Sequence, residues 1–237
     1  MPKHKKGWLQ TRSLETEEMD NLNLSGEVLH QTLNGLSVIN RLLGNTNTTF
    51  KAVKTAILNS ARPLTIIDLG CGGGDNLRAI ANWSYKNNYP VELIGIDGNE
   101  NILNYARSKN KKGFSIDYLQ ADILALSYQL PPCDLLISSH FIYHFSDEEL
   151  VRFLKISKDQ ISTKIIFSEL RRSRMAYLLF KFGNIFLPFS KMIKEDRFKA
   201  IRRSFKKEEL ETIIKKAGFE RFKIRRKFAF RWQVEIF

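Results

Sequence analysis

A glycine-rich turn is the part of this sequence best suited to chemistry. Residues 65–80 read TIIDLGCGGGDNLRAI, in which a buried strand runs through several glycines into a helix. Glycine lets the backbone turn sharply and approach a ligand, and the amides at a helix start attract negative charge. We therefore expect a nucleotide-like ligand here. The dehydrogenase pattern GxGxxG is not matched by Gly70, Gly72, Gly73 and Gly74, so the surrounding residues must identify the ligand.

Acids stand at the ends of three successive strands. Asp68 ends the first, and Asp97 ends the second about 23 residues after Gly74, where a carboxylate can accept both hydroxyl protons of a ribose. Asp122 follows the third strand, and the apolar Ile123 beside it can cover an adenine face. Each acid alone could be a turn residue. Together they favour one shared ligand.

The elements that must position these residues alternate between strands and helices. From residue 64 onward, helical patterns at 76–85, 100–109 and 147–158 separate most of the short apolar runs. The runs are LTIIDLG, VELIGID, SIDYLQAD, DLLISSH and TKIIFSE. This order predicts buried parallel strands in an open, doubly wound α/β sheet.

The two ends of the chain add further elements. Ser25 can cap a helix that stops at Gly44, and a second short helix is expected at about 50–59. These helices form either an amino-terminal cap or a cover for a sheet edge or face. Near the other end, KKEELETIIKKAGF predicts a helix that stops at Gly218, and two alternating runs after it predict a hairpin.

At these motifs the chain resembles class I methyltransferases that use S-adenosylmethionine (SAM). DLGCGGG is similar to the D-x-G-x-G-x-G turn of that family, and the likeness covers roughly residues 64–237. It implies a Rossmann-like, seven-stranded, mostly parallel sheet with a reversed last strand, SAM as the cofactor and no metal. The implied cofactor-binding residues are Asp68, Gly70, Cys71, Gly72, Gly74, Asp97, Gly98, Asp122, Ile123 and Ser138.

A narrower resemblance is to bacterial methyltransferases of polyketide and pigment-type biosynthesis. It rests on EEMDNLNLSGEVLHQTL, VINRLLG, ISSHFIYHF and the closing FRW. We expect residues 1–60 to form a tail and helical cap, and residues 61–237 to form the SAM-binding domain with a helical lid at about 171–203.

Residues that could move a proton follow the fourth strand in SSHFIYHF. An acid–base group helps when the methyl acceptor is a hydroxyl or phenol. His140 is the expected base, with Tyr143 and His144 beside it, although the same side chains could cap the strand or pack a helix start. The (D/N)PPY tetrad of base N-methylation is absent here, so O- or C-methylation of a hydrophobic or phenolic small molecule is favoured.

Charge is distributed unevenly along the 237 residues. The net charge is +13, and from Arg171 onward roughly 20 Lys and Arg face roughly 7 Asp and Glu. Such a region is either a solvated face or a surface for an acidic carrier protein, an anionic membrane or, with less support, nucleic acid. Arg171, directly after the fifth strand, could instead meet an anionic group of the substrate.

The predicted lid contains an apolar run, 175–193, that is too interrupted to span a membrane. The interruptions are Lys181, Gly183, Pro188 and Lys191. A lid, an interfacial helix on anionic lipid and ordinary packing on the amino-terminal helices all fit this run. The amino terminus lacks a secretory apolar segment, and Cys71 and Cys133 lack disulfide or metal spacing, so we expect a cytoplasmic protein, peripheral to a membrane if the basic third binds lipid.

Three functions remain open at this stage. The first is methylation of a small molecule, the second is RNA methylation, suggested by the basic last third, and the third is a regulator that binds SAM without turnover. Salt-sensitive RNA binding would favour the second. The sequence identifies neither the acceptor atom nor the oligomeric state.

Overall fold

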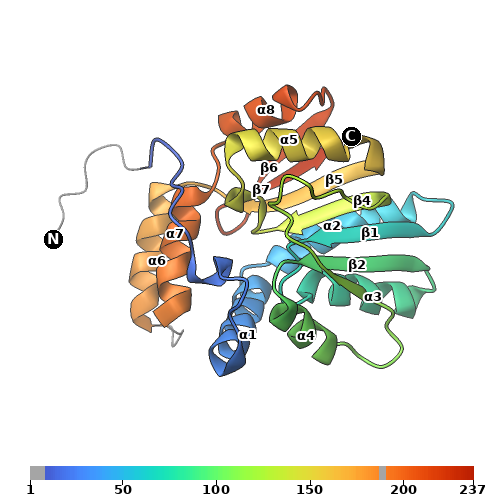
Figure 1. Ribbon diagram of the computed structural model, residues 1–237, viewed down its shortest axis with the longest axis horizontal. Coiled ribbons are helices and arrows are strands. Elements are labelled where there is room, and N and C mark those ends of the chain that lie inside the picture. Colours follow the sequence, from blue (N-terminus) through green and yellow to red (C-terminus); the bar gives the residue numbers. More distant parts are fainter. Residues whose placement is uncertain (1–8, 187–190) are drawn as a thin grey trace.

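The computed structural model describes the backbone of residues 9–186 and 191–237 and the side chains of residues 9–181 and 192–237. A seven-stranded sheet with the order β3-β2-β1-β4-β5-β7-β6 forms its centre (Figure 1). The strands are β1 (Leu64–Leu69), β2 (Val91–Asp97), β3 (Asp117–Gln120), β4 (Cys133–Ser139), β5 (Ile161–Leu170), β6 (Phe222–Lys227) and β7 (Arg231–Ile236).

The direction of the strands brings the predicted site residues to one edge. β1 to β5 pair in parallel, and Asp68 lies level with Gly95 of β2 and Ile137 of β4. β7 runs antiparallel to β5 and forms a hairpin with β6. The predicted doubly wound sheet with a reversed last strand is therefore confirmed. Because the parallel strands end together, Asp68, Asp97 and Ser139 face the same loop region.

Helices cover both faces of the sheet. On one face Ile66 and Leu135 pack against α2 and α3, and on the other Ile67 and Leu136 pack against α5 and α8. Strands buried on both faces account for the continuous apolar runs in the sequence. The helices around the sheet are α2 (Asn45–Leu58), α3 (Asp75–Asn87), α4 (Glu100–Ser108), α5 (Asp147–Ser157) and α8 (Lys207–Lys216).

The two amino-terminal helices have different neighbours. α1 (Gly26–Leu42) ends at a turn in which Gly44 has a φ of 71°, and α2 starts directly after it, five residues earlier than predicted. The early start was missed because Asn45, Thr48 and Thr49 favour helices weakly. α2 lies on the sheet face, whereas α1 packs Leu29 and Leu33 against α4 and also contacts α7.

Two helices from the predicted lid region pack against each other at one end of the molecule, on the left of Figure 1. They are α6 (Arg174–Phe186) and α7 (Lys191–Arg203), and the ring of Tyr177 lies 4.8 Å from that of Phe198 between them. Residues 187–190, which the lid prediction includes, lie outside the described residues, as do residues 1–8 of the predicted tail. Within the described part of the chain, no helix is long and apolar enough to cross a membrane.

The basic last third of the chain is partly an internal structure. The side chain of Arg172 is fully buried, where it donates to the carbonyl oxygens of Leu9 and Ser204 and pairs with Glu209. Arg203 and Arg231 are also buried, with exposed fractions of 5% and 2%. These three cations therefore belong neither to a solvated face nor to a docking face, because each lies inside the protein.

We predict that Arg172→Ala lowers the free energy of unfolding by about 3 kcal/mol, because it leaves Glu209 and buried carbonyl groups without their cation. Arg174→Ala, two residues away on an exposed position, is the matched control and should change stability by no more than about 0.5 kcal/mol. Urea unfolding followed by circular dichroism measures both. Equal stability of the two variants would contradict an internal role for Arg172.

Candidate functional site

The glycine turn follows β1 as predicted. Gly70 has a φ of 66°, and a Cβ there would lie 2.2 Å from Phe141 Cγ, so only glycine fits. Gly72 has a φ of 52°, but a Cβ on it would meet nothing within 4 Å. The turn is therefore closed by Phe141 on one side and open at Gly72, which leaves its backbone accessible to a ligand.

Asp97 connects the end of β2 to this turn. Its carboxylate accepts hydrogen bonds from the backbone N–H of Gly72 at 3.0 Å and of Asn99 at 3.1 Å. Burial raises its pKa, although these hydrogen bonds favour the charged form. A Cβ on the next residue, Gly98, would lie 2.8 Å from Leu22 Cδ2. Leu22 therefore covers the end of β2 beside Asp97.

Asp68 is a buried acid with one unused oxygen. Its Oδ2 accepts a long, 3.5 Å hydrogen bond from Asn76 Nδ2, and its Oδ1 has no hydrogen-bond partner among the residues that the structure describes. Burial raises the pKa of this carboxyl to about 8. A buried acceptor without a partner is unfavourable, so the site is suited to a ligand that brings a donor or a positive charge to Asp68.

Four other predicted cofactor contacts have different surroundings. Asp122 is exposed and accepts from the backbone N–H of Leu124, while Ile123 beside it is buried. The Cys71 side chain points into the core, so only its backbone can face the turn. Ser138 is fully buried and donates to the carbonyl of Leu69. This geometry does not support the expected cofactor contact of Ser138, because its hydroxyl ties β4 to β1.

His140 begins the loop after β4 in a left-handed conformation, with a φ of 56°. Its Nε2 accepts a hydrogen bond from Arg231 Nε at 3.2 Å, and its backbone N–H donates to Ser168. Burial, followed by the charge of Arg231, holds the pKa of His140 well below the ordinary value. The ring is therefore neutral, and the nitrogen that would accept a proton already has a donor.

His144 has the opposite arrangement. Its Nδ1 lies 2.8 Å from Asp20 Oδ1, so Nδ1 carries the proton and the lone pair belongs to Nε2. Burial lowers the pKa of His144 despite the adjacent carboxylate, and 14% of its side chain remains exposed. The ring lies 5.4 Å from that of Phe141, which itself packs on Gly70. His144 is thus a neutral, carboxylate-oriented imidazole close to the glycine turn.

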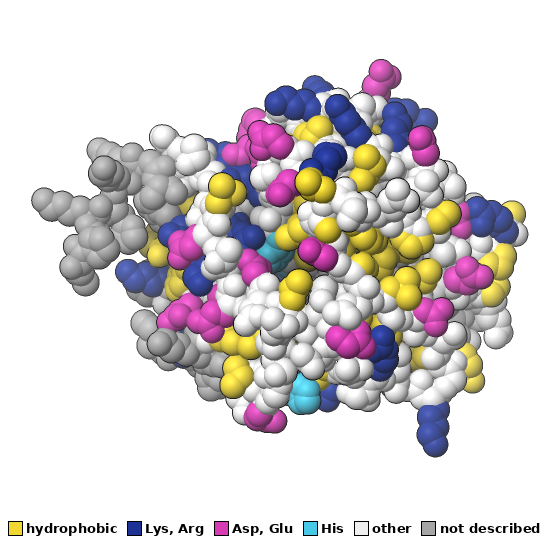
Figure 2. Space-filling view, in the orientation of Figure 1, with side chains coloured by type: hydrophobic (Ala, Val, Ile, Leu, Met, Phe, Trp, Pro, Cys, Tyr) yellow, Lys and Arg dark blue, Asp and Glu magenta, His cyan; other side chains and the backbone are white. Residues whose placement is uncertain are grey.

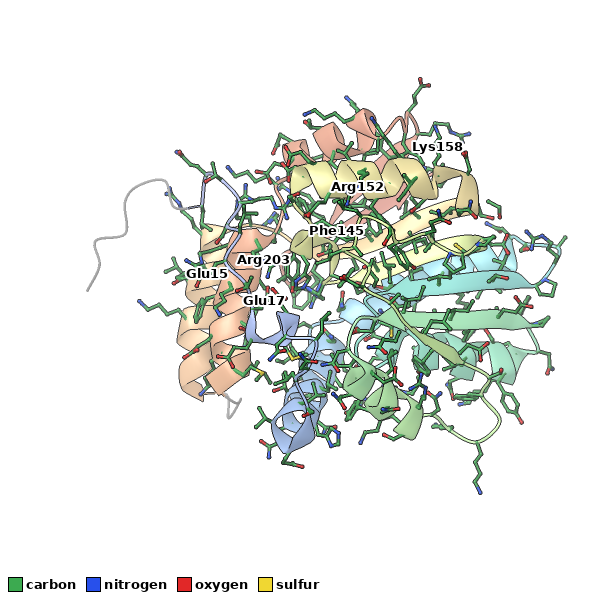
Figure 3. The ribbon with its side chains drawn as sticks, in the orientation of Figure 1. Glu15, Glu17, Phe145, Arg152, Lys158 and Arg203 are labelled. Atoms are coloured by element: carbon green, nitrogen blue, oxygen red, sulfur yellow. The ribbon has the colours of Figure 1, made fainter. Side chains whose placement is uncertain are left out.

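A segment from the amino terminus completes this side of the site. Arg203 Nη1 of α7 lies 2.6 Å from Asp20 Oδ2 and 3.5 Å from Glu17 Oε1, and Figure 3 shows Glu17 and Arg203 close together. Asp196 of α7 accepts from the backbone N–H groups of Glu18 and Met19. We call residues 12–24 the strap, because they run across the carboxyl edge of the sheet.

The strap carries a cluster of ionisable groups that sequence reasoning missed. Oxygens of Glu17 and Asp20 and a nitrogen of His144 lie within 4.8 Å of one another. Arg203 supplies the positive charge and pairs with Asp20, whereas burial raises the pKa of Glu17 beside it to about 8. Hydrogen bonds from His144 and Arg203 outweigh burial and hold the pKa of Asp20 well below its usual range. No local pattern signals this cluster, because its members come from three distant segments.

Tyr143 has a structural environment. It is buried, its hydroxyl lies 3.5 Å from Glu17 Oε2, and burial raises its pKa well above the ordinary value. The phenol therefore stays protonated. It points toward the strap rather than toward the glycine turn.

Glu169, near the end of β5, is a second residue that sequence reasoning missed. Its Oε1 accepts from the backbone N–H groups of Phe141 at 3.0 Å and Ile142 at 3.2 Å, and its Oε2 is buried without a partner. Burial raises the pKa of this carboxyl to about 8. The sequence offers only a weak indication of this role, which is that Glu169 is an acid within an otherwise apolar predicted strand. Glu169 fixes the loop that carries His140, Tyr143 and His144.

The polar edge of the site also involves α2. Thr49 Oγ1 lies 3.0 Å from Ser139 Oγ, which also accepts from Asn76 Nδ2 at 3.2 Å. Asn45 accepts from Ser168 Oγ at 2.7 Å. The first turn of α2 therefore forms part of the wall at the ends of β4 and β5.

Figure 2 shows a histidine at the bottom of a hollow near the centre of one face of the molecule.

Comparison with known proteins agrees with this arrangement. Residues 66–160 match the family model described as "Methyltransferase domain". No curated protein matches the sequence. The matched range includes the glycine turn, Asp97 and the loop that carries His140 and His144.

Solved structures with the same fold include three methyltransferases. Magnesium protoporphyrin IX methyltransferase from Synechocystis PCC 6803 with bound SAH has a TM-score of 0.56 at 18% identity, over 81% of this chain and 82% of that chain. A plantazolicin methyltransferase in complex with a desmethyl analog and SAH has a TM-score of 0.59 at 17% identity, over 81% and 83%. Human N-acetylserotonin methyltransferase in complex with SAM has a TM-score of 0.59 at 15% identity, over 86% and 54%.

We predict that Glu169→Gln changes the pH dependence of stability. In the unfolded chain this carboxyl has an ordinary pKa near 4.5, and in the folded protein it is about 8. The folded form keeps the proton between these values, so the contribution of Glu169 is present at low pH and is lost as pH rises toward 8. From pH 5 to 8 the variant should gain about 1 kcal/mol or more relative to wild type.

Thermal and urea unfolding of both proteins across this pH range measures the effect. The glutamine keeps an acceptor for Phe141 and Ile142, so the loop should be retained. A constant stability difference across the range would show that Glu169 ionises normally in the folded protein.

Proposed function

We propose that this protein, whose residues 66–160 are a methyltransferase domain, transfers the methyl group of SAM to a hydroxyl of a hydrophobic or phenolic small molecule. The observation that supports this most directly is the pair of features at one sheet edge. The glycine turn bonded to Asp97 suits the cofactor, and His144 beside it suits deprotonation of an acceptor.

The residues present fit SAM. Asp97 would accept the ribose hydroxyl protons, and the open backbone at Gly72 would allow the close approach that a Cβ would prevent. The partnerless Oδ1 of Asp68 would meet the positively charged methionine portion. Asp122 and Ile123, which follow β3, would contact the adenine. When bound, SAM supplies an activated methyl group on a sulfonium.

The small-molecule class is supported by the surroundings of the site and by its relatives in fold. Phe141 and Leu22 provide apolar surface beside the glycine turn and Gly98. The three structures compared above are named as methyltransferases of magnesium protoporphyrin IX, N-acetylserotonin and plantazolicin, and each name refers to a small molecule. An apolar acceptor with one polar reacting group suits such a pocket.

His144 is a better base than His140. The lone pair of His140 Nε2 is occupied by Arg231, whereas Asp20 holds the Nδ1 proton of His144 and directs its Nε2 lone pair away from the strap. In the proposed step the acceptor oxygen forms a bond to the methyl carbon, the carbon–sulfur bond breaks, and the hydroxyl proton passes to His144 Nε2. The products are the methyl ether, SAH and a protonated imidazole, which releases its proton to solvent.

RNA methylation, which rested on the basic last third, has weaker support. Three of its cations, Arg172, Arg203 and Arg231, are buried and engage internal partners. A nucleic-acid surface needs exposed cations that can reach phosphates. Incubating cell extract with the protein and isotopically labelled SAM, followed by mass spectrometry, tests the small-molecule proposal. Labelling of RNA alone would refute it.

We predict that Asp97→Ala weakens SAM binding by on the order of 1–3 kcal/mol, because charge-assisted hydrogen bonds to the ribose are lost. Isothermal titration calorimetry measures the affinity. Asp117→Ala, an exposed acid at the start of β3, is the control and should bind as wild type does. Unchanged affinity in a folded Asp97→Ala protein would remove Asp97 from the cofactor site.

We predict that His144→Ala lowers turnover by roughly 100-fold or more while SAM affinity is retained, because a positioned base is lost. His30→Ala, on the exposed side of α1, is the control, and His140→Ala should retain most activity if it remains folded. Asp20→Asn should lower kcat and move the acid limb of the pH profile, because it removes the carboxylate that orients the imidazole. Loss of activity in His140→Ala with normal turnover in His144→Ala would reverse the assignment.

A further inference from the structure

The outer face of α6 is apolar, and none of the residues that the structure describes covers it. Met175, Leu178 and Leu179 have exposed fractions of 63%, 52% and 54%. Their spacing of i, i+3 and i+4 places them on one face of the helix. We call these three residues the α6 stripe. Single exposed apolar side chains are ordinary, but three neighbouring ones on one helix face indicate a surface for an apolar partner.

The opposite face of α6 is already packed. Ala176 is 1% exposed, the Tyr177 ring contacts Phe198 of α7, and Arg197 of α7 lies over the Phe180 ring at 4.3 Å. Packing within the hairpin therefore uses the inner residues and leaves the α6 stripe outside. Simple packing against the rest of the protein, one of the readings of this run, does not account for the stripe.

Cations stand at both ends of the stripe. Arg174 directly precedes it and Lys181 follows it, and both side chains are exposed. Within the described part of the chain, neither forms an ion pair. The long side chains of Lys and Arg can bind anionic groups while their methylene stems lie on an apolar surface. An anionic partner therefore complements the ends of the stripe, and an apolar partner complements its middle.

We propose that the α6 stripe docks the protein on an anionic membrane surface, with Met175, Leu178 and Leu179 entering the headgroup–acyl boundary and Arg174 and Lys181 contacting lipid phosphates. A bilayer suits these residues better than a protein partner does. Protein interfaces are anchored by aromatic and Arg side chains seated in pockets, whereas this surface is a convex helix face with flexible aliphatic side chains. The net charge of +13 adds a general attraction to anionic lipid.

The position of the stripe connects this surface to the site. α6 packs on α7, and α7 holds the strap through Asp196 and Arg203. Docking would therefore bring the strap side of the site toward the bilayer. A hydrophobic acceptor dissolved in the membrane would then reach the site without crossing bulk water.

Sedimentation with lipid vesicles tests the docking surface without any measurement of activity. The probes are vesicles of phosphatidylcholine alone and vesicles that also contain phosphatidylglycerol, each at low and high salt. Wild type should bind the phosphatidylglycerol vesicles, less at high salt, and should bind phosphatidylcholine weakly. Leu178→Ser combined with Leu179→Ser should reduce this binding about tenfold or more, and Arg174→Gln combined with Lys181→Gln should lower the salt dependence more than the control charge variant below does.

Matched variants control for general loss of apolar surface and charge. Leu126→Ser changes a leucine that is 74% exposed on the β3–β4 connection, and Lys111→Gln with Lys112→Gln removes two exposed cations elsewhere. Both should bind vesicles as wild type does, and all variants should keep the wild-type melting temperature. Three results would overturn the proposal: no binding of wild type to anionic vesicles, equal binding by the stripe and control variants, or a dimer in solution that only the stripe variant dissociates.

Discussion

Arg203 is the buried cation on which one whole side of the site depends. Its guanidinium lies against Glu17 and Asp20, which would otherwise be two acids confined with little water. Removing the charge of Arg203 or of Asp20 would leave the other charge buried without a counter-charge, which is unfavourable in a low-dielectric interior. The same guanidinium therefore fixes the strap on α7, keeps Asp20 ionised and, through Asp20, selects the tautomer of His144.

The proposed cofactor side and the proposed acceptor side of the site are built by different physical means. The cofactor side rests on backbone geometry: parallel strands that end together, a turn that only glycine can form beside Phe141, and an acid bonded to that turn. The acceptor side rests on side-chain charge, with His144, Asp20 and Arg203 meeting from three segments. The cofactor side is held in place by the sheet. The acceptor side has one defined arrangement, because its buried charges must be paired.

This division also explains what the sequence alone could predict. Strand order, the reversed β7, and the positions of Asp68 and Asp97 follow from local patterns, because period, glycine and strand-end acids act within a few residues. Local patterns do not predict the partners of the two histidines. Arg231 lies 91 residues from His140, and Asp20, the partner of His144, is itself paired with Arg203, 183 residues away. Without these contacts the two histidines look alike, and His140 was preferred. Likewise, a count of charges cannot distinguish the buried Arg172 from the exposed Arg174.

The strap depends on contacts with residues far along the chain. Asp196 lies 178 residues after Glu18, Arg203 lies 183 residues after Asp20, and Phe205 packs under the guanidinium of Arg12. Contacts of such long sequence separation form late, after loop-closure entropy has been overcome. A nascent chain can thus assemble β1 to β4 and the glycine turn while Asp20 still has no cation to meet. The imidazole of His144 acquires its orientation only after α7 has been made, so a chain that has not reached Arg203 holds the parts of the proposed cofactor side without the proposed acceptor side.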